Sequence, residues 1–162
     1  LHRKALVQEH CHQKSILDTS GEKKLFDAIE LDYEIPDTGC CGMAGPFGFD
    51  AAHYDVSIAV GERVLLPKVR EAGKDVLIVA NGFSCREQIS QTTDRQAMHP
   101  AQVLKMAIDD RGVARNDALP ELRFMPSTRD ESRKAARRGL SGLALLAAVS
   151  VTAAAILLRR RR

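Results

Sequence analysis

The stretch Asp75-Val76-Leu77-Ile78-Val79-Ala80 decides the fold of this 162-residue chain. After its first residue the run is wholly apolar, and Lys74 and Asn81-Gly82 bound it. Strands inside a parallel sheet are covered on both faces, so they read as unbroken apolar runs rather than as alternating ones. The stretch therefore predicts an interior strand of a parallel sheet.

Three shorter segments supply further strands around this one. Residues 4–9 read as a strand, and residues 97–99 read as a short final strand. Residues 31–35 alternate apolar and acidic side chains before Pro36, which is typical of a half-buried edge strand. We expect an α/β fold, a doubly wound Rossmann-like parallel sheet with flanking helices.

Helical spacing of apolar residues fills the segments between these strands. Residues 15–30 predict two short helices interrupted near Gly21, and residues 50–72 predict a longer helix that Pro67 bends or divides. A last helix opens at Pro100, a residue suited to the first helical turn. Each of these helices follows a predicted strand, as a βαβ arrangement requires.

A glycine-rich loop, Asp37-Thr38-Gly39-Cys40-Cys41-Gly42-Met43-Ala44-Gly45-Pro46-Phe47-Gly48, follows the edge strand. Its glycines recur at every third position, which excludes a regular helix or a central strand and lets the backbone approach another group closely. Two adjacent thiols on such a bend suggest a site where both sulfurs face one object.

The other two cysteines of the chain also follow predicted strands. Cys11 stands between His10 and His12 at the end of the first strand, and Cys85 comes five residues after Ala80, near the start of a helix. The carboxyl ends of parallel strands share one edge of the sheet, so we expect all four cysteines to meet there. Taken singly, the two histidines also fit a solvated or capping role, and Cys85 fits a buried inert one.

Four thiolates are the number that holds a cubane iron–sulfur cluster or a tetrahedral zinc ion. The predicted ligands are Cys11, Cys40, Cys41 and Cys85, with His10 or His12 as further candidates. The spacing does not choose between iron–sulfur and zinc. A third alternative is a thiol enzyme in which Cys40 and Cys41 cycle between dithiol and disulfide.

The positive net charge is confined to the C-terminal end of the chain. Residues 129–162 carry nine Lys and Arg against two Asp and Glu, whereas residues 1–128 carry fifteen against nineteen. With no Trp and no aromatic residues interleaved with Arg, a nucleic-acid partner is not expected. We divide the chain into a folded domain (1–111), a polar basic linker (112–138), a hydrophobic segment (139–158) and a basic tail (159–162).

The hydrophobic segment has no charged residue and is rich in Leu, Ala and Val. At about 1.5 Å per residue, a helix of this length crosses a hydrocarbon core of about 30 Å. It predicts a transmembrane anchor at the cytoplasmic side of the cell membrane, and the alternative is an Ala-rich helix packed on a partner. The chain opens on Leu1 rather than Met, and we expect it to be the C-terminal piece of a longer protein.

Several motifs in the same order resemble the cysteine-rich CCG domain. They are His10-Cys11-His12-Gln13-Lys14, the Gly39–Gly48 loop followed by His53-Tyr54, and Asn81-Gly82-Phe83-Ser84-Cys85-Arg86. The domain is shared by one of the subunits of heterodisulfide reductase, by the iron–sulfur subunits of glycolate oxidase and anaerobic glycerol-3-phosphate dehydrogenase, and by the C-terminal part of FAD-linked oxidases such as D-2-hydroxyglutarate and D-lactate dehydrogenase-like fusions. The resemblance covers residues 4–108.

The resemblance implies that Cys11, Cys40, Cys41 and Cys85 hold a cluster, with 4Fe-4S favoured. Many members end in a CxxC pair, but here Arg86-Glu87-Gln88 follows Cys85, so one ligand of a five-cysteine noncubane cluster is missing. It further implies that FAD lies in a partner domain or subunit, which oxidises a 2-hydroxy acid. We expect electron relay from that flavin-containing dehydrogenase toward a membrane acceptor such as a quinone; the alternative is a zinc-binding structural or docking domain.

Lys14 and Arg86 stand close to the predicted cysteine ligands in the sequence. Their charges would offset the negative charge of thiolates and guide an anionic partner. A solvated surface role fits both residues equally well.

Overall fold

A computed structural model describes residues 1–111 and 117–124 of the chain. Within them, three parallel strands form a sheet in the order β2-β1-β3: β1 is Lys4–Gln8, β2 is Asp32–Glu34 and β3 is Leu77–Ala80. The register pairs Ala5 of β1 with Tyr33 on one side and with Leu77 on the other. All four residues of β3 are buried, as the apolar run predicts, but the central strand is β1 and not β3. Beyond its ladder with β1, β3 has one parallel bridge, on its other side.

The predicted final strand is reduced to a single parallel bridge between Val79 and Met98. The Met98 amide donates to the carbonyl of Ile78 at 2.8 Å, and the Ala80 amide donates to the carbonyl of Met98 at 2.9 Å. Pro100 opens the next helix two residues later, so the chain leaves the sheet before a ladder can form.

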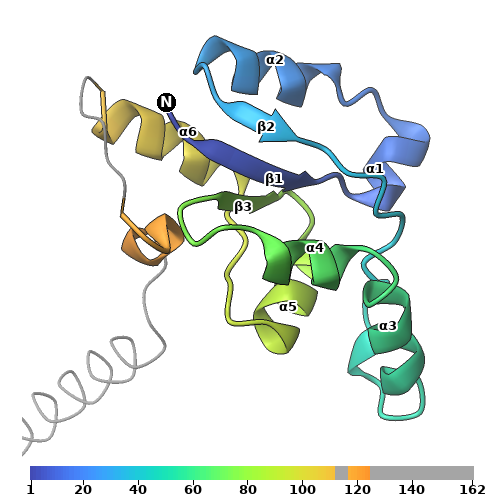
Figure 1. The fold of residues 1–162 in the computed structure, drawn as a ribbon. Helices are drawn as coiled ribbons and strands as arrows, with labels where there is room; N and C mark the ends of the chain where they lie inside the picture. The colour runs from blue at the N-terminus through green and yellow to red at the C-terminus, as the bar shows by residue number, and fades with distance from the viewer. Residues whose placement is uncertain (112–116, 125–162) are drawn as a thin grey trace, which may run out of the picture. The chain divides into compact units, whose positions relative to one another are not determined.

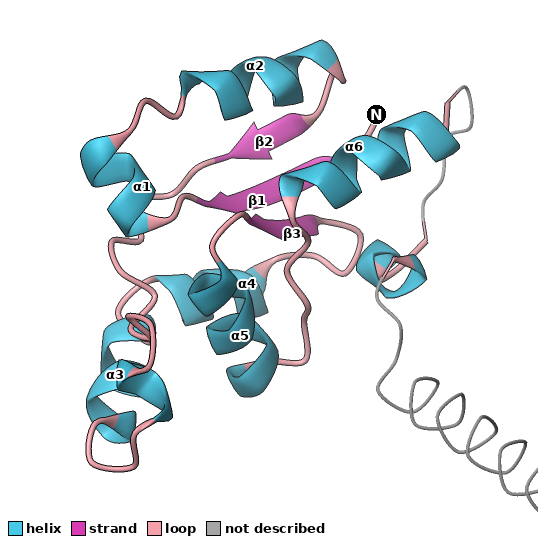
Figure 2. Cartoon of the chain, turned by 180° about the vertical axis from the view of Figure 1, so that it is seen from behind, coloured by secondary structure: helices cyan, strands magenta, loops and turns pink. Residues whose placement is uncertain are grey.

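Six helices surround the sheet in the described part of the chain. They are α1 (Cys11–Ile16), α2 (Ser20–Ala28), α3 (Tyr54–Gly61), α4 (Leu65–Glu71), α5 (Phe83–Thr92) and α6 (Pro100–Asp109). Figures 1 and 2 show α2 beside β2 at one edge of the sheet and α4 with α5 on the other side of β3. α6 runs behind the strands in Figure 1 and in front of them in Figure 2, so it covers one face.

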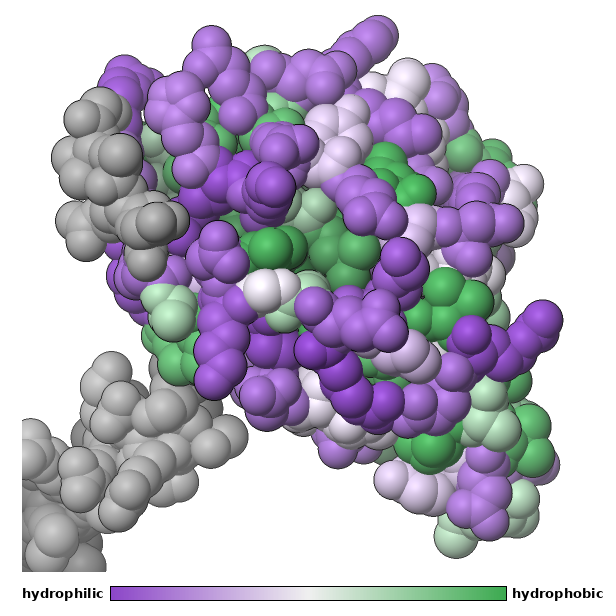
Figure 3. Space-filling model, viewed as in Figure 1, coloured by the Kyte–Doolittle hydropathy of each residue, from purple (hydrophilic) through white to green (hydrophobic). Residues whose placement is uncertain are grey.

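The long helix predicted over residues 50–72 is divided at Glu62–Val64 and not at Pro67. Pro67 is the third residue of α4, where a backbone N–H has no partner inside the helix, so its missing donor costs nothing there. α3 therefore projects away from the sheet in both views. Phe49, Tyr54 and Val56 remain about half exposed on it and beside it (55%, 47% and 54%), and Figure 3 shows apolar side chains gathered at this end.

Residues 117–124, which the sequence placed in the linker, belong to the folded unit. A short 3-10 helix, η2 (Pro120–Arg123), brings Glu121 into the interior, where its side chain is 1% exposed and lies 2.8 Å from the Nε of Arg95. Asp117 forms an ion pair with Arg3, and the Leu119 amide donates to the carbonyl of Lys74 at 2.7 Å. These contacts join charges far apart in sequence, which composition alone cannot reveal.

No helix among residues 1–111 and 117–124 is long and apolar enough to cross a membrane. The predicted transmembrane segment, residues 139–158, lies outside the described residues, as do the basic tail and the larger part of the predicted linker. The anchor therefore stays a prediction.

Candidate cysteine site

The ends of the three strands carry the four cysteines to the same edge of the sheet. Cys11 is the first residue of α1 after β1, Cys40 and Cys41 lie in the loop after β2, and Cys85 is the third residue of α5 after β3. Because β1 pairs with both other strands in parallel, all three segments leave the sheet in one direction. Figure 1 shows α1 and the segment before α3 beyond the tip of β1.

The four thiols form one group made of two contacting pairs. The side chains of Cys41 and Cys85 are hydrogen-bonded to each other, and so are those of Cys40 and Cys11. The charges of Cys11, Cys40 and Cys41 all act on Cys85, so the pairs are close enough to influence one another. The structure thus brings together the cysteines that the sequence placed at separate strand ends.

The group is closed on one side and open on the other. Cys41 is 2% exposed and Cys85 is fully buried, whereas Cys11 and Cys40 are half-buried. A molecule that approaches the site therefore meets Cys11 and Cys40 first.

Glycines shape the loop that presents Cys40 and Cys41. Gly39, Gly42 and Gly45 all have positive φ angles of 66°, 94° and 65°. The Gly42 amide donates to the Sγ of Cys40 at 3.3 Å, and a Cβ on Gly42 would lie 2.0 Å from the carbonyl oxygen of Ser57 in α3. The loop therefore packs directly against the α3 backbone at Gly42, the residue that follows the two cysteines.

We expect Gly42→Ala to lower the free energy of unfolding by more than the 1–3 kcal/mol or so of left-handed backbone strain alone, because the new methyl would also collide with Ser57. Gly39→Ala is the matched control: its φ is also positive, but nothing lies within 4 Å of its Cβ position. Urea unfolding of both variants measures the difference. Equal destabilisation would show that the close approach at Gly42 does not matter.

The environment of each thiol sets its affinity for protons. The hydrogen bond from Cys85, together with backbone amides that include those of Met43 and Ala44, lowers the pKa of Cys41 to about 6. The same hydrogen bond and burial raise the pKa of Cys85, which stays protonated. Burial also raises the pKa of Cys40, against the Gly42 amide, which lowers it.

In the reduced, metal-free chain, we expect one thiolate to appear near pH 6, as measured by ultraviolet thiolate absorbance. The unfolded chain binds the Cys41 proton up to an ordinary pKa of 9.0, so Cys41 makes folding stability rise with pH between about 6 and 9.0. Cys41→Ser should remove the step near pH 6, whereas Cys40→Ser should keep it. A step that survives in Cys41→Ser would assign the low pKa to another thiol.

The two candidate histidines differ in their surroundings. His10 precedes α1. A Cβ added to Gly82 would lie 2.7 Å from the His10 ring and 3.2 Å from the Sγ of Cys85. Gly82 therefore lets the His10 ring pack beside Cys85. His12 is exposed, with its ring centroid 6.2 Å from that of His10.

His53 has a structural role at the start of α3. Its ring stacks on Phe47 with the centroids 4.4 Å apart, and its Nδ1 lies 2.9 Å from Asp50. These contacts hold the end of the glycine-rich loop against the start of α3.

The donor set fits a thiophilic metal centre, although the ligand shell is not closed. Four free thiols, two of them buried and one with a lowered pKa, have the chemistry that iron–sulfur clusters and zinc select. Within the described ranges, however, no three His, Cys, Asp or Glu side chains stand in a ready-made metal-binding geometry. The site brings the four candidate ligands into contact as two pairs.

Lys14 and Arg86 are engaged by other groups. Lys14 lies 3.4 Å from Asp37, and Arg86 donates to the carbonyls of Ala80 and Asn81 at 3.1 and 2.7 Å. Arg86 thereby fixes the turn between β3 and α5 that carries Cys85. The sequence missed Arg63, which lines a hollow beside Cys40, because nothing in its neighbourhood marks it as part of a site.

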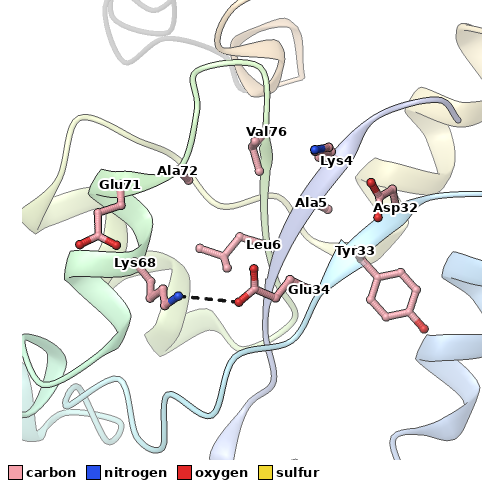
Figure 4. Close-up of a pocket in the computed structure, with 10 residues that line it drawn as sticks. All are labelled: Lys4, Ala5, Leu6, Asp32, Tyr33, Glu34, Lys68, Glu71, Ala72 and Val76. Atoms are coloured by element: carbon pink, nitrogen blue, oxygen red, sulfur yellow. Dashed lines mark ion pairs between the residues drawn. The ribbon is translucent and has the colours of Figure 1, made fainter.

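A separate hollow of about 420 Å³ lies over β1 and β2 beside α4 (Figure 4). Its floor includes Leu6 and its rim carries charges of both signs, with Lys68 3.8 Å from Glu34 across it. No cysteine or histidine lines it. It is therefore distinct from the cysteine site.

The chain is similar to parts of two kinds of dehydrogenase. It is 31% identical to D-2-hydroxyglutarate dehydrogenase of Pseudomonas putida over 100 residues, which is 60% of this chain and 10% of that protein. It is also 31% identical to a subunit of the anaerobic glycerol-3-phosphate dehydrogenase of Escherichia coli K12 over 106 residues, which is 65% of this chain and 26% of that relative. A D-2-hydroxyglutarate dehydrogenase of Pantoea ananatis is 29% identical over 59% of the chain.

The matched part spans between about a tenth and a quarter of these relatives. No protein-family model and no solved structure matches the chain. The similarity marks it as a domain related to these oxidoreductases.

Proposed function

We propose that this chain is an iron–sulfur electron-transfer module that works with a FAD-linked 2-hydroxy-acid dehydrogenase. The observation that carries the proposal is the gathering of Cys11, Cys40, Cys41 and Cys85 from three strand ends into one group. The similarity to D-2-hydroxyglutarate dehydrogenases and to part of an anaerobic glycerol-3-phosphate dehydrogenase supports an oxidoreductase role. The flavin and the substrate would lie in a partner domain or subunit.

Each cysteine would contribute differently to the site. Cys41 is the thiol most ready to bind metal because its pKa is already lowered to about 6, and Cys85 supports it from the interior. Cys11 and Cys40 would complete the ligand set on the open side, with His10 packed beside Cys85. When bound, an iron–sulfur cluster supplies one-electron storage and transfer.

Burial of Cys41 and Cys85 keeps water from the inner half of the site, and the backbone amides around Cys41 favour negative charge there. Both effects act on the thiolates whatever metal they hold. The half-buried side, with Cys11 and Cys40, is the side from which electrons would enter and leave.

Metal and sulfide analysis of the anaerobically purified chain tests the proposal. We expect iron and acid-labile sulfide in about equal amounts, with broad visible absorption that bleaches on reduction. Zinc at one ion per chain without iron or sulfide would replace this proposal with the zinc-binding docking domain. Alkylation of all four cysteines in the native, unreduced chain would exclude both metals.

We further propose that residues 139–158 anchor the chain in a membrane, where an acceptor such as a quinone would receive the electrons. We expect a chain that ends at residue 138 to move from the membrane fraction to the soluble fraction, because it loses the uncharged segment. Immunoblots of the separated fractions measure the shift. If the full chain is found in the soluble fraction, the segment does not act as an anchor under those conditions and the membrane acceptor loses its support.

A further inference from the structure

A hollow of about 220 Å³ lies against the open side of the cysteine site. Asp37, Thr38, Gly39 and Cys40 of the glycine-rich loop form one wall. The other wall is formed by Val60, near the end of α3, with Arg63 and Val64 of the α3–α4 turn. Cys40 is the one cysteine in this lining, and it is also one of the two that are half-buried rather than buried. The hollow is thus a passage from solvent to this thiol.

Arg63 supplies the positive charge of the hollow, and Asp37 supplies a negative one. Its side chain is exposed, and it forms no ion pair with any residue in the described ranges. Asp37, the carboxylate of the lining, is already 3.4 Å from Lys14, and the neighbouring Arg70 is paired with Glu62 at 2.6 Å. Arg63 is therefore the cation of this region that retains its capacity to bind an anion.

The remaining walls suit a short apolar group. Val60 and Val64 line the same hollow as Arg63, and both are only partly buried. Gly39 has no side chain, and nothing lies within 4 Å of its Cβ position, which keeps the opposite wall open. A guanidinium beside a small apolar wall matches a carboxylate on a short hydrocarbon chain.

We infer that this hollow is a binding site for a small carboxylate, held by Arg63 beside Cys40. The carboxylate pairs with the guanidinium, and its chain of a few carbons lies between Val60 and Val64. An arginine on an open surface binds carboxylates weakly, so the concave apolar walls are what make the site selective. The site depends on Arg63 and the shape of the hollow, and it is independent of which metal the cysteines bind.

Saturation-transfer NMR on the full-length, as-purified chain tests the site with propionate as the probe. Propionamide, which has nearly the same shape without the charge, is the matched ligand control. We expect the saturation transferred from the protein to propionate to be at least about threefold greater than that transferred to propionamide. The preference should disappear in Arg63→Gln and persist in Arg111→Gln, which removes an exposed arginine at the far end of α6.

A second variant tests the hollow while keeping Arg63. Val60→Glu places a carboxylate near Arg63 on the same wall of the hollow, where it would pair with the guanidinium, so saturation transfer to propionate should again fall to the level of propionamide. An equal loss in Arg111→Gln, or an unchanged signal in Arg63→Gln, would overturn the proposal by showing general attraction to surface charge. Absence of iron from the same preparation would contradict the electron-transfer proposal. It would not affect the carboxylate site, which is tested by the Arg63-dependent preference for propionate.

Discussion

Replacing Arg95 by methionine should lower the free energy of unfolding by about 3–5 kcal/mol, because it leaves Glu121 as a buried, unpaired charge. The two side chains are 3% and 1% exposed, so water cannot take the place of the lost partner. Arg95 also donates to the carbonyls of Gly73 and Val76 at 3.2 and 2.6 Å, which ties η2 to the start of β3. Urea unfolding followed by circular dichroism measures the effect.

Two further variants distinguish the effect of losing the ion pair from the effect of losing the packing of the Arg95 side chain. Arg95→Met combined with Glu121→Leu should recover much of the loss, because a buried pair replaced by apolar side chains no longer leaves a charge uncompensated. Arg70→Met, which removes the exposed pair with Glu62, should cost about 1 kcal/mol or less. If Arg95→Met lowered the free energy of unfolding as little as Arg70→Met does, the packing of residues 117–124 on the domain would not depend on the Arg95–Glu121 pair.

The second large effect is expected at Cys41. Cys41→Ser replaces the thiol of lowest pKa with a hydroxyl that does not ionise near neutral pH, so we expect affinity for iron to fall by at least about 100-fold. Iron and sulfide per chain after anaerobic purification give the measurement. Cys40→Ser and Cys11→Ser should lose metal as well, if all four thiols are ligands.

Met43→Leu is the matched control for this series. Met43 is 1% exposed in the same loop, and leucine fills a similar volume without changing a ligand, so iron content should stay near that of the unmodified chain. Full iron content in Cys41→Ser would remove Cys41 from the ligand set. Iron loss in Met43→Leu would instead indicate that the loop tolerates no change.

The positions of the strands and of the cysteines could be predicted from the sequence because both depend on local signals. The apolar run at residues 75–80 fixed β3, and the parallel arrangement then required the segments after the strands to meet at one edge. The extent of the sheet was less predictable: Met98 pairs through one bridge only, since Pro100 ends the strand.

Features that depend on distant partners could not be predicted. The pairing of Arg95 with Glu121 joins residues 26 positions apart and turned an apparent linker into part of the domain. The sequence predicted one group of four thiols, with a Cys40–Cys41 dithiol as an alternative, but it did not predict the contacts of Cys41 with Cys85 and of Cys40 with Cys11. Neither pairing follows from spacing, because each depends on how the loop turns at Gly42.

The central position of β1 in the sheet has a consequence for synthesis. Of the three strands in this sheet, β1 is synthesised first and waits for partners on both sides, and Cys85 emerges well after the other three cysteines. At about 5–20 residues per second, the nascent chain exposes Cys41 for about 2–9 s before its contact partner has been made. During that interval the synthesised thiols are open to stray metals and oxidants, and any centre that uses all four thiols could be loaded only after translation has passed Cys85.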